Sequence, residues 1–245
     1  MDILETDSRY KKTSLATVRS IIPKLLPFLA TCSIYFGLWL PLSEPSWYSA
    51  FIKSLPILSL VFFVVIHSAG QGRLNSYRKK ILLGLIFSAA GDISLIWEDS
   101  FLLGMIMFGL AHLMYTIAFG LRPLNIRVFI VLALFCATFY TVTLPYLNGP
   151  FVYMVGGYSA LIGIMAWRAL ARVRMTHYVF SWAYFSAGLG SIFFMVSDCV
   201  LAVDKFCFPI TNSRAIIMGT YYGAQMLITL SVAGSSEDEF RWKMQ

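Results

Sequence analysis

Long apolar runs follow one another along almost the whole chain, separated by short polar segments. Each run is close to the length that an α-helix needs to cross a bilayer, roughly 20 residues. Inside a bilayer such runs must be helical, because backbone polar groups there have to bond internally. We therefore predict an all-α, polytopic transmembrane bundle of about eight helices. The predicted spans are Leu25–Leu42, Phe51–Ile66, Ile81–Trp97, Phe101–Leu121, Val128–Tyr146, Phe151–Leu170, Val179–Val203 and Ala215–Ala233.

The basic residues test this count, because Lys and Arg accumulate on the cytosolic side of a membrane. With eight spans, all but three of the 19 Lys and Arg residues fall on the side that holds both chain ends. Only Lys53, Lys205 and Arg214 fall on the other side, which we call the outer side. Both termini are therefore expected in the cytosol. The predicted organisation is a polar segment 1–21, a transmembrane domain 22–233 and a cytosolic tail 234–245.

The composition excludes several classes of protein. The chain is 58% hydrophobic and 13% charged, whereas soluble domains average about 25% charged residues. The net charge of +7 sits in short clusters between apolar runs rather than in a basic stripe, which argues against nucleic-acid binding. The four cysteines and three histidines show no metal-ligand spacing. We therefore expect no metal site, and the chemistry considered below needs no metal or organic cofactor.

Three ionisable residues stand well inside the predicted spans, namely Asp92, His112 and Asp198, and Lys53 lies near the outer end of the second span. A charged residue in the membrane costs roughly 2.5–3.5 kcal/mol on insertion scales, so such residues face the protein interior and are candidates for function. A structural role, in which they only hydrogen-bond across helices, is the alternative.

The depths of these residues suggest one shared layer. Asp92 and Asp198 each stand five residues before the outer end of their predicted spans, which is about 7–8 Å at 1.5 Å per residue. Lys53 enters the membrane from the same side. We therefore expect the polar side chains to converge on one cavity in the outer half. The further members of this layer are His112, Tyr115, Tyr221, Tyr222 and Gln225.

Several short motifs, in order and in matching spans, resemble the YhhN-type lysoplasmalogenase family. They are Lys53-Ser54-Leu55-Pro56, Phe87-Ser88-Ala89-Ala90-Gly91-Asp92, Ala111-His112-Leu113-Met114-Tyr115, Ser197-Asp198, Lys205-Phe206-Cys207-Phe208-Pro209 and the stretch from Thr220 to Leu227. The resemblance covers about residues 22–233. It implies hydrolysis of the vinyl ether bond of lysoplasmalogens, a lysophospholipid substrate, and a place in the endoplasmic reticulum membrane, which the basic C-terminus 241–245 weakly supports.

The residue types suit that chemistry. A vinyl ether is stable to base but yields to acid, because protonation of its terminal carbon gives an oxocarbenium ion that water traps. Enzymes that form such ions on sugars use two carboxyl groups, and an apolar setting keeps one of them protonated. Asp92 and Asp198 are the predicted acid and base, in an order that the sequence leaves open. His112 is expected to place water, and Lys53 to hold the substrate phosphate.

The remaining candidates have supporting roles. Tyr115 and Tyr222 are expected to orient a carboxyl group, and Tyr221 and Gln225 share a helix face in the same layer. Two other functions stay open. An intramembrane aspartyl protease also uses paired aspartates, although Ala89 departs from its Gly-x-Gly-Asp signature. A proton-coupled transporter or lipid carrier also uses buried Asp and His residues.

Overall fold

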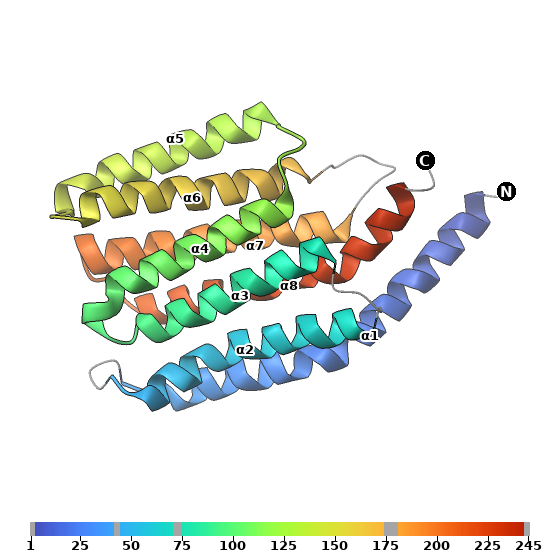
Figure 1. Cartoon of the computed structure of the whole chain (residues 1–245), viewed down its shortest axis with the longest axis horizontal. Helices are drawn as coiled ribbons and strands as arrows, with labels where there is room; N and C mark the ends of the chain where they lie inside the picture. The colour runs from blue at the N-terminus through green and yellow to red at the C-terminus, as the bar shows by residue number, and fades with distance from the viewer. Residues whose placement is uncertain (1–2, 42–44, 71–74, 174–180, 243–245) are drawn as a thin grey trace.

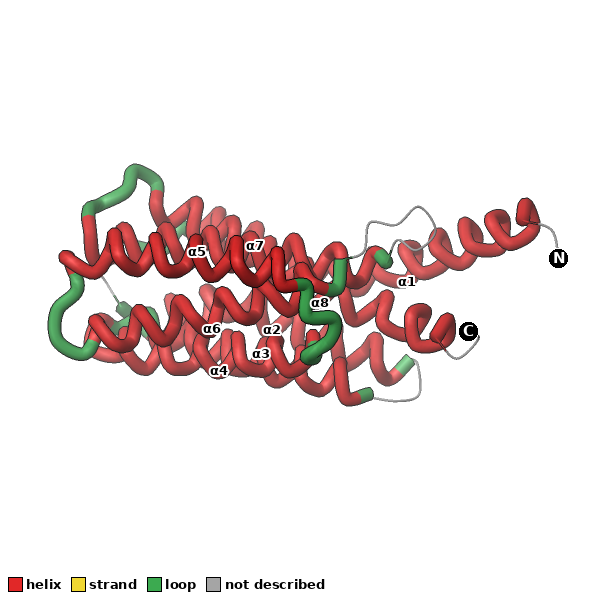
Figure 2. The backbone as a smooth tube through the Cα atoms, turned by 90° about the horizontal axis from the view of Figure 1, so that it is seen from above, coloured by secondary structure: helices red, strands yellow, loops and turns green. Residues whose placement is uncertain are grey.

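The computed structural model describes residues 3–41, 45–70, 75–173 and 181–242, which are helical apart from short connections (Figure 2). These ranges hold eight α-helices and three short helical turns. The α-helices are α1 (Ile3–Leu38), α2 (Trp47–Ala69), α3 (Ser76–Ser94), α4 (Phe101–Phe119), α5 (Ile126–Thr143), α6 (Phe151–Ala171), α7 (Trp182–Ala202) and α8 (Ser213–Trp242). The turns are η1 (Glu98–Ser100), η2 (Leu144–Tyr146) and the π-helical η3 (Val203–Cys207).

The helices lie side by side along the long axis of the molecule, and the first turn of α1 and the last turn of α8 are at the same end (Figure 1). Helix α8 packs against α7, α3 and α2, while α4 packs against α3 and α6. Helices α1 and α5 lie at opposite sides of the bundle, with α1 on α2 and α5 on α6. The predicted all-α bundle is confirmed, and the polar layer therefore forms among α2, α3, α4, α6, α7 and α8.

Seven segments of the described chain are long and apolar enough to cross a membrane, and together they identify an integral, multi-pass membrane protein. They include parts or all of every α-helix except α3. Helix α3 has 19 residues and carries Arg78, Lys79, Lys80 and Asp92, so its charge sets it apart from the others. It nevertheless lies within the bundle between α2 and α4. Its apolar residues Ile81, Leu85 and Ala89 are buried there together with Asp92.

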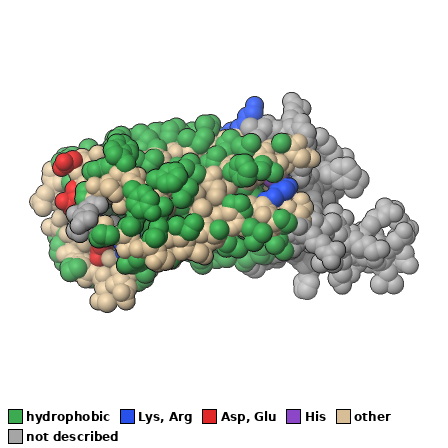
Figure 3. Space-filling view, turned by 90° about the horizontal axis from the view of Figure 1, so that it is seen from below, with side chains coloured by type: hydrophobic (Ala, Val, Ile, Leu, Met, Phe, Trp, Pro, Cys, Tyr) green, Lys and Arg blue, Asp and Glu red, His purple; other side chains and the backbone are tan. Residues whose placement is uncertain are grey.

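The surface of the bundle is that of a protein in lipid. Large apolar side chains point outward over most of its length, among them Ile22, Leu134 and Val131, the last 66% exposed. On the face seen in Figure 3, acidic side chains lie at one end, and basic side chains lie toward the end that carries the termini. This separation agrees with the orientation predicted from the basic residues, which stays a prediction.

Helix α2 contains a proline that the sequence analysis placed near the start of its span. The helix begins at Trp47, so Pro56 is its tenth residue and lies well inside it. Proline has no N–H, so the helical hydrogen bond that position 56 would donate to the Ile52 carbonyl is missing. Lys53 belongs to the same turn, and its carbonyl accepts a hydrogen bond from another helix, as described below.

Candidate functional site

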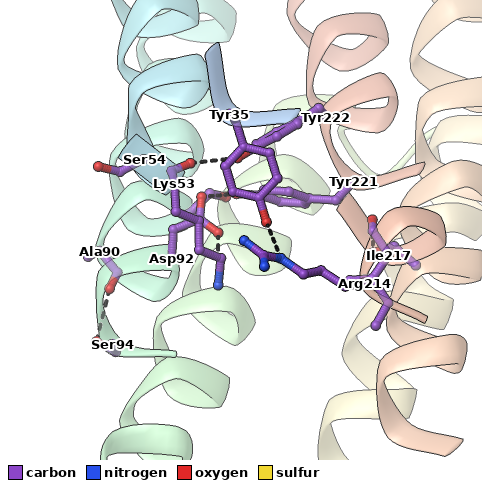
Figure 4. Close-up of polar contacts among 12 residues, drawn as sticks. Tyr35, Lys53, Ser54, Ala90, Asp92, Ser94, Arg214, Ile217, Tyr221 and Tyr222 are labelled. Carbon is purple, nitrogen blue, oxygen red and sulfur yellow. Dashed lines mark hydrogen bonds and ion pairs between the residues drawn. The ribbon is translucent and has the colours of Figure 1, made fainter. Parts of the chain in front are cut away.

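Asp92 is buried near the C-terminal end of α3 and contacts two other helices. Its Oδ1 lies 3.8 Å from Nζ of Lys53 on α2, and its Oδ2 accepts a hydrogen bond of 2.7 Å from the Tyr221 hydroxyl on α8. The Asp92 side chain is 2% exposed. A carboxyl group so far from water needs such partners, because a buried charge without them is destabilising. Figure 4 shows this group, which we call the Asp92 cluster.

Lys53 is held in place through its backbone as well as its side chain. The Tyr222 hydroxyl on α8 donates a hydrogen bond of 2.7 Å to the Lys53 carbonyl, in the turn of α2 that precedes Pro56. Tyr221 and Tyr222 are consecutive on α8, and they reach Asp92 on α3 and Lys53 on α2. Helix α8 thus positions both members of the ion pair.

The Lys53 side chain faces a cavity of about 780 Å³ at the end of the bundle opposite the termini, which we call the vestibule. Residues of η1 and η3 line its rim, where Lys205 pairs with Glu98 at 2.9 Å. Arg214, at the start of α8, lines the vestibule too. The vestibule is therefore rich in charge, and it connects the Asp92 cluster to that end of the bundle.

Asp198 on α7 belongs to a second group of residues, which we call the Asp198 cluster. Its Oδ2 accepts a hydrogen bond of 2.6 Å from the Tyr158 hydroxyl on α6 and lies 3.4 Å from Nε2 of His112 on α4. The same Nε2 lies 2.9 Å from the Tyr158 oxygen, and Nδ1 of His112 lies 3.3 Å from Sδ of Met165. Three helices therefore share a closed triangle of carboxyl, phenol and imidazole.

Asp198 and His112 differ in how far their side chains are exposed. The His112 side chain is completely buried, whereas that of Asp198 is 15% exposed. Asp198 and Tyr158 line a second, smaller cavity that we call the crevice. Apart from Ser159, the other residues that line the crevice are apolar or contain sulfur; most belong to α4, α5, α6 and α7, including Phe135 at the lipid-facing surface. Asp198 can therefore touch a molecule in the crevice, and His112 can act only through its neighbours.

The two aspartates are not in direct contact. No hydrogen bond or ion pair joins their carboxyl groups in the described chain, and each has its own partners. The Phe194 ring separates the clusters, with its centroid 5.4 Å from that of Tyr221 and 4.7 Å from that of His112. The expected single cleft thus divides into two clusters, because aromatic side chains fill the space between α3 and α7. Their roles in catalysis stay a prediction.

The two cavities share a wall, however. Leu95, Phe101 and Leu201 line both the vestibule and the crevice. These residues come from the ends of α3, α4 and α7, close in sequence to the two aspartates. A single elongated molecule that crosses this wall would therefore contact both cavities.

Tyr115 and Gln225 form a third polar group that touches neither aspartate. The Tyr115 hydroxyl donates to Oε1 of Gln225 at 2.7 Å, and Nε2 of Gln225 donates to Ser88 at 2.9 Å. All three side chains are buried. The Tyr115 ring lies where a Cβ at position 84 would be, so only Gly84 allows α3 and α4 to approach this closely. The group ties α3, α4 and α8 together.

Tyr158, Arg214 and Tyr35 belong to these surroundings and were not predicted as site residues. Tyr158 is one of 13 tyrosines in the chain, and no charged residue near it in sequence marks it out. Arg214 could have been singled out, because it is one of only three basic residues on the outer side. In the part of the chain that the structure describes, no group of three or more His, Cys, Asp or Glu side chains is arranged to hold a metal ion.

Comparisons with known proteins extend over most of the chain. The model of the YhhN family matches residues 48–232. The chain is 46% identical over 225 residues to lysoplasmalogenase TMEM86A of Bos taurus, covering 91% of this chain and 94% of that protein. It is 40% identical over 211 residues to lysoplasmalogenase TMEM86B of Rattus norvegicus, covering 86% of this chain and 84% of that protein.

The match includes every residue of both clusters, since Lys53, Asp92, His112, Asp198 and Tyr221 all lie within 48–232. No solved structure matches the chain. Because the family model covers well over half of the sequence and the relatives align over most of their length, this protein is a member of the YhhN family.

Proposed function

We propose that this protein is a lysoplasmalogenase, which hydrolyses the vinyl ether bond of a lysoplasmalogen to a fatty aldehyde and a glycerophospho-ethanolamine or glycerophosphocholine. Relatives with 46% and 40% identity bear that enzyme name. The observation that carries the proposal is a carboxyl group, Asp198, on the wall of an apolar crevice that adjoins a charged vestibule. A lysoplasmalogen has the same division into a long apolar chain and a charged head group.

The acid step falls to Asp198. It lines the crevice, whose free volume of about 60 Å³ suits the vinyl end of the alkenyl chain rather than the whole chain, and it is the more exposed of the two carboxyl groups. Its proton passes to the vinyl carbon farther from the ether oxygen, and the other vinyl carbon becomes an oxocarbenium ion. Tyr158 and His112 orient the carboxyl group through the triangle of contacts, and His112 is placed to restore the proton afterwards.

The water step falls to Asp92. The vestibule beside Lys53 supplies water, and Asp92 takes one of its protons as the oxygen bonds to the cationic carbon. The resulting hemiacetal then breaks its bond to the glycerol oxygen, which leaves as an alcohol with the proton that Asp92 holds. The hemiacetal hydroxyl gives up its proton as the aldehyde forms, and this proton returns to Asp198. One water is consumed, no electrons are transferred, and the chain's own side chains supply both proton steps. By this assignment Lys53 pairs with the Asp92 carboxylate and also faces the head group of the substrate.

The same geometry argues against an aspartyl protease. Enzymes of that kind need two carboxyl groups close enough to share one proton, whereas here each aspartate has separate partners. A transporter or lipid carrier is distinguished from an enzyme by experiment. Product formed in detergent favours the enzyme, because no gradient exists across a detergent micelle. We also propose, from the resemblance to animal members of the family, that the membrane is that of the endoplasmic reticulum.

The test is aldehyde release by the purified protein in detergent. We expect it to cleave lysoplasmenyl-ethanolamine and to leave the saturated alkyl ether analogue intact, since only the vinyl ether can be protonated to an oxocarbenium ion. Asp92→Asn and Asp198→Asn should each abolish most of this activity while eluting as folded protein in size-exclusion chromatography. Near-normal rates in both variants would show that the assignment is wrong.

A further inference from the structure

We infer that Arg214 and Lys53 together form a phosphate-binding subsite at the inner end of the vestibule. The ligand is a phosphate ester anion, and this inference rests on the proposed function in taking the head group of a lysophospholipid as its source. Arg214 then determines which lipids bind productively, without taking part in the proton transfers.

The contacts of Arg214 fix its orientation without satisfying its charge. Its Nε donates to the Tyr35 hydroxyl at 3.2 Å, and its Nη1 donates to the Leu40 carbonyl at 2.6 Å. The guanidinium lies over the rings of Tyr35 and Trp39, at 5.4 and 4.4 Å from their centroids. In the described residues no carboxylate pairs with it. A guanidinium has five N–H donors, so donors remain for a ligand in the vestibule.

Lys53 and Arg214 face the same space. Figure 4 shows the Lys53 ammonium and the Arg214 guanidinium directed toward one another from α2 and α8, beside Asp92. Both residues line the vestibule. At 3.8 Å, the contact between Lys53 and Asp92 is longer than a good hydrogen bond, which leaves the ammonium able to donate to a second acceptor.

The charge at the inner end of the vestibule favours an anion, although the lining as a whole has as many carboxylates as cations. Two cations lie beside one carboxylate at the inner end: Asp92 pairs with Lys53, and Arg214 has no carboxylate partner among the described residues. At the rim, Lys205 and Glu98 neutralise one another, and Oδ1 of Asp204 accepts the Ile210 N–H. A phosphodiester carries one negative charge and accepts the paired hydrogen bonds that a guanidinium donates. It would therefore complete the charge balance at this place.

The position also fits the reaction. In a lysoplasmalogen three carbons separate the phosphate oxygen from the vinyl ether oxygen. A phosphate held by Lys53 and Arg214 would place the vinyl ether near the wall of Leu95, Phe101 and Leu201, which both cavities share. The alkenyl chain would then continue into the crevice beside Asp198. Binding of the head group thus determines where the vinyl ether lies relative to Asp198.

The experiment compares two substrates in the full-length protein: lysoplasmenyl-ethanolamine and 1-alkenyl-glycerol, which has the vinyl ether but no phosphate. For Arg214→Gln we expect KM for the phospholipid to rise roughly 10- to 100-fold, the effect of losing hydrogen bonds to a charged group, with kcat nearly unchanged. The kinetics with 1-alkenyl-glycerol should not change. Arg214→Lys keeps the charge but loses the paired N–H donors of the guanidinium, so its KM for the phospholipid should fall between those of the unmodified protein and Arg214→Gln. The Lys variant also provides the test if the Gln variant does not fold.

Lys205→Gln is the matched control, because it removes the same charge from the same cavity outside the subsite. Inorganic phosphate should inhibit cleavage of the phospholipid competitively in the unmodified protein, and less strongly in Arg214→Gln. This measurement tests free phosphate as a ligand separately from the phosphate of the lipid. The inference is overturned if Arg214→Gln slows both substrates alike, or if Lys205→Gln raises KM as much. A protein that cleaves neither substrate before mutation would refute the proposed function instead.

Discussion

The Asp92 and Asp198 clusters place the same residue type in two different chemical settings. Asp92 is almost completely buried beside the Lys53 ammonium, and Lys53 lies between Asp92 and the charged vestibule. Asp198 has a phenol and an imidazole as partners and lines an apolar crevice directly. Under the proposed mechanism, this difference divides the acid and base work between two carboxyl groups that are not in contact. Charge is concentrated on one side of Phe194, and access to the lipid chain on the other.

The largest effect is expected at Asp198, where loss of the acid removes the first proton transfer. Asp198→Asn should lower kcat about 10³-fold, within the range that general acids contribute, with little change in thermal stability. The measurement is aldehyde release at saturating substrate. Asp99→Asn is the control, since it removes a carboxylate from the vestibule lining without touching either cluster. A loss in Asp198→Asn that is no greater than in the control would contradict the assignment of the acid.

Asp92→Asn should lower kcat less, about 10²-fold, and should also destabilise the protein. Without its carboxylate, Lys53 keeps a poorly solvated charge, and breaking such a buried pair costs about 3 kcal/mol. The double variant Lys53→Met/Asp92→Asn should recover stability in thermal unfolding while staying inactive. Recovery of activity along with stability would mean that Asp92 serves only to balance Lys53, and that the base lies elsewhere.

The tyrosines offer a finer version of the same comparison, because each cluster has one that donates to its aspartate. Tyr158→Phe also breaks the contact with His112, so kcat should fall roughly 10-fold, the equivalent of one hydrogen bond to a charged group. Tyr221→Phe leaves Lys53 in place beside Asp92, so its effect on kcat should be smaller. Equal effects of the two substitutions would indicate that both carboxyl groups share one function.

The sequence predicted the helices and the outer polar layer because both follow from burial of polarity in an apolar medium. Asp92, Asp198, Lys53 and His112 stand out in apolar runs for that reason. The division into two clusters could not be predicted in the same way. It depends on how α3, α4 and α7 rotate about their axes and on Phe194, which in sequence is one of 20 phenylalanines. Which side chains each aspartate contacts depends on how the helices pack, and the spacing of residues along the sequence does not reveal it.

Tyr158 illustrates this limit most clearly. Its functional neighbours, His112 and Asp198, are 46 and 40 residues away in the chain, on helices that meet only in the folded bundle. Tyr115 shows the reverse case. It lies three residues after His112, which puts both on one helix face, and it was expected to orient a carboxyl group, yet the structure directs the Tyr115 hydroxyl to Gln225 and away from both aspartates. A shared face in sequence therefore did not mean a shared site.

The Tyr115 group gives the smallest expected effect on activity and so marks the boundary of the site. Tyr115→Phe leaves Oε1 of Gln225 buried without its donor, which should cost about 1–3 kcal/mol. The thermal midpoint should fall while kcat of the folded protein changes little. Replacing both partners in Tyr115→Phe/Gln225→Leu should be less destabilising than the sum of the single changes, because fewer buried groups lose a partner. A large loss of kcat in Tyr115→Phe at unchanged stability would instead extend the catalytic machinery into this group and join it to the Asp92 cluster through α8.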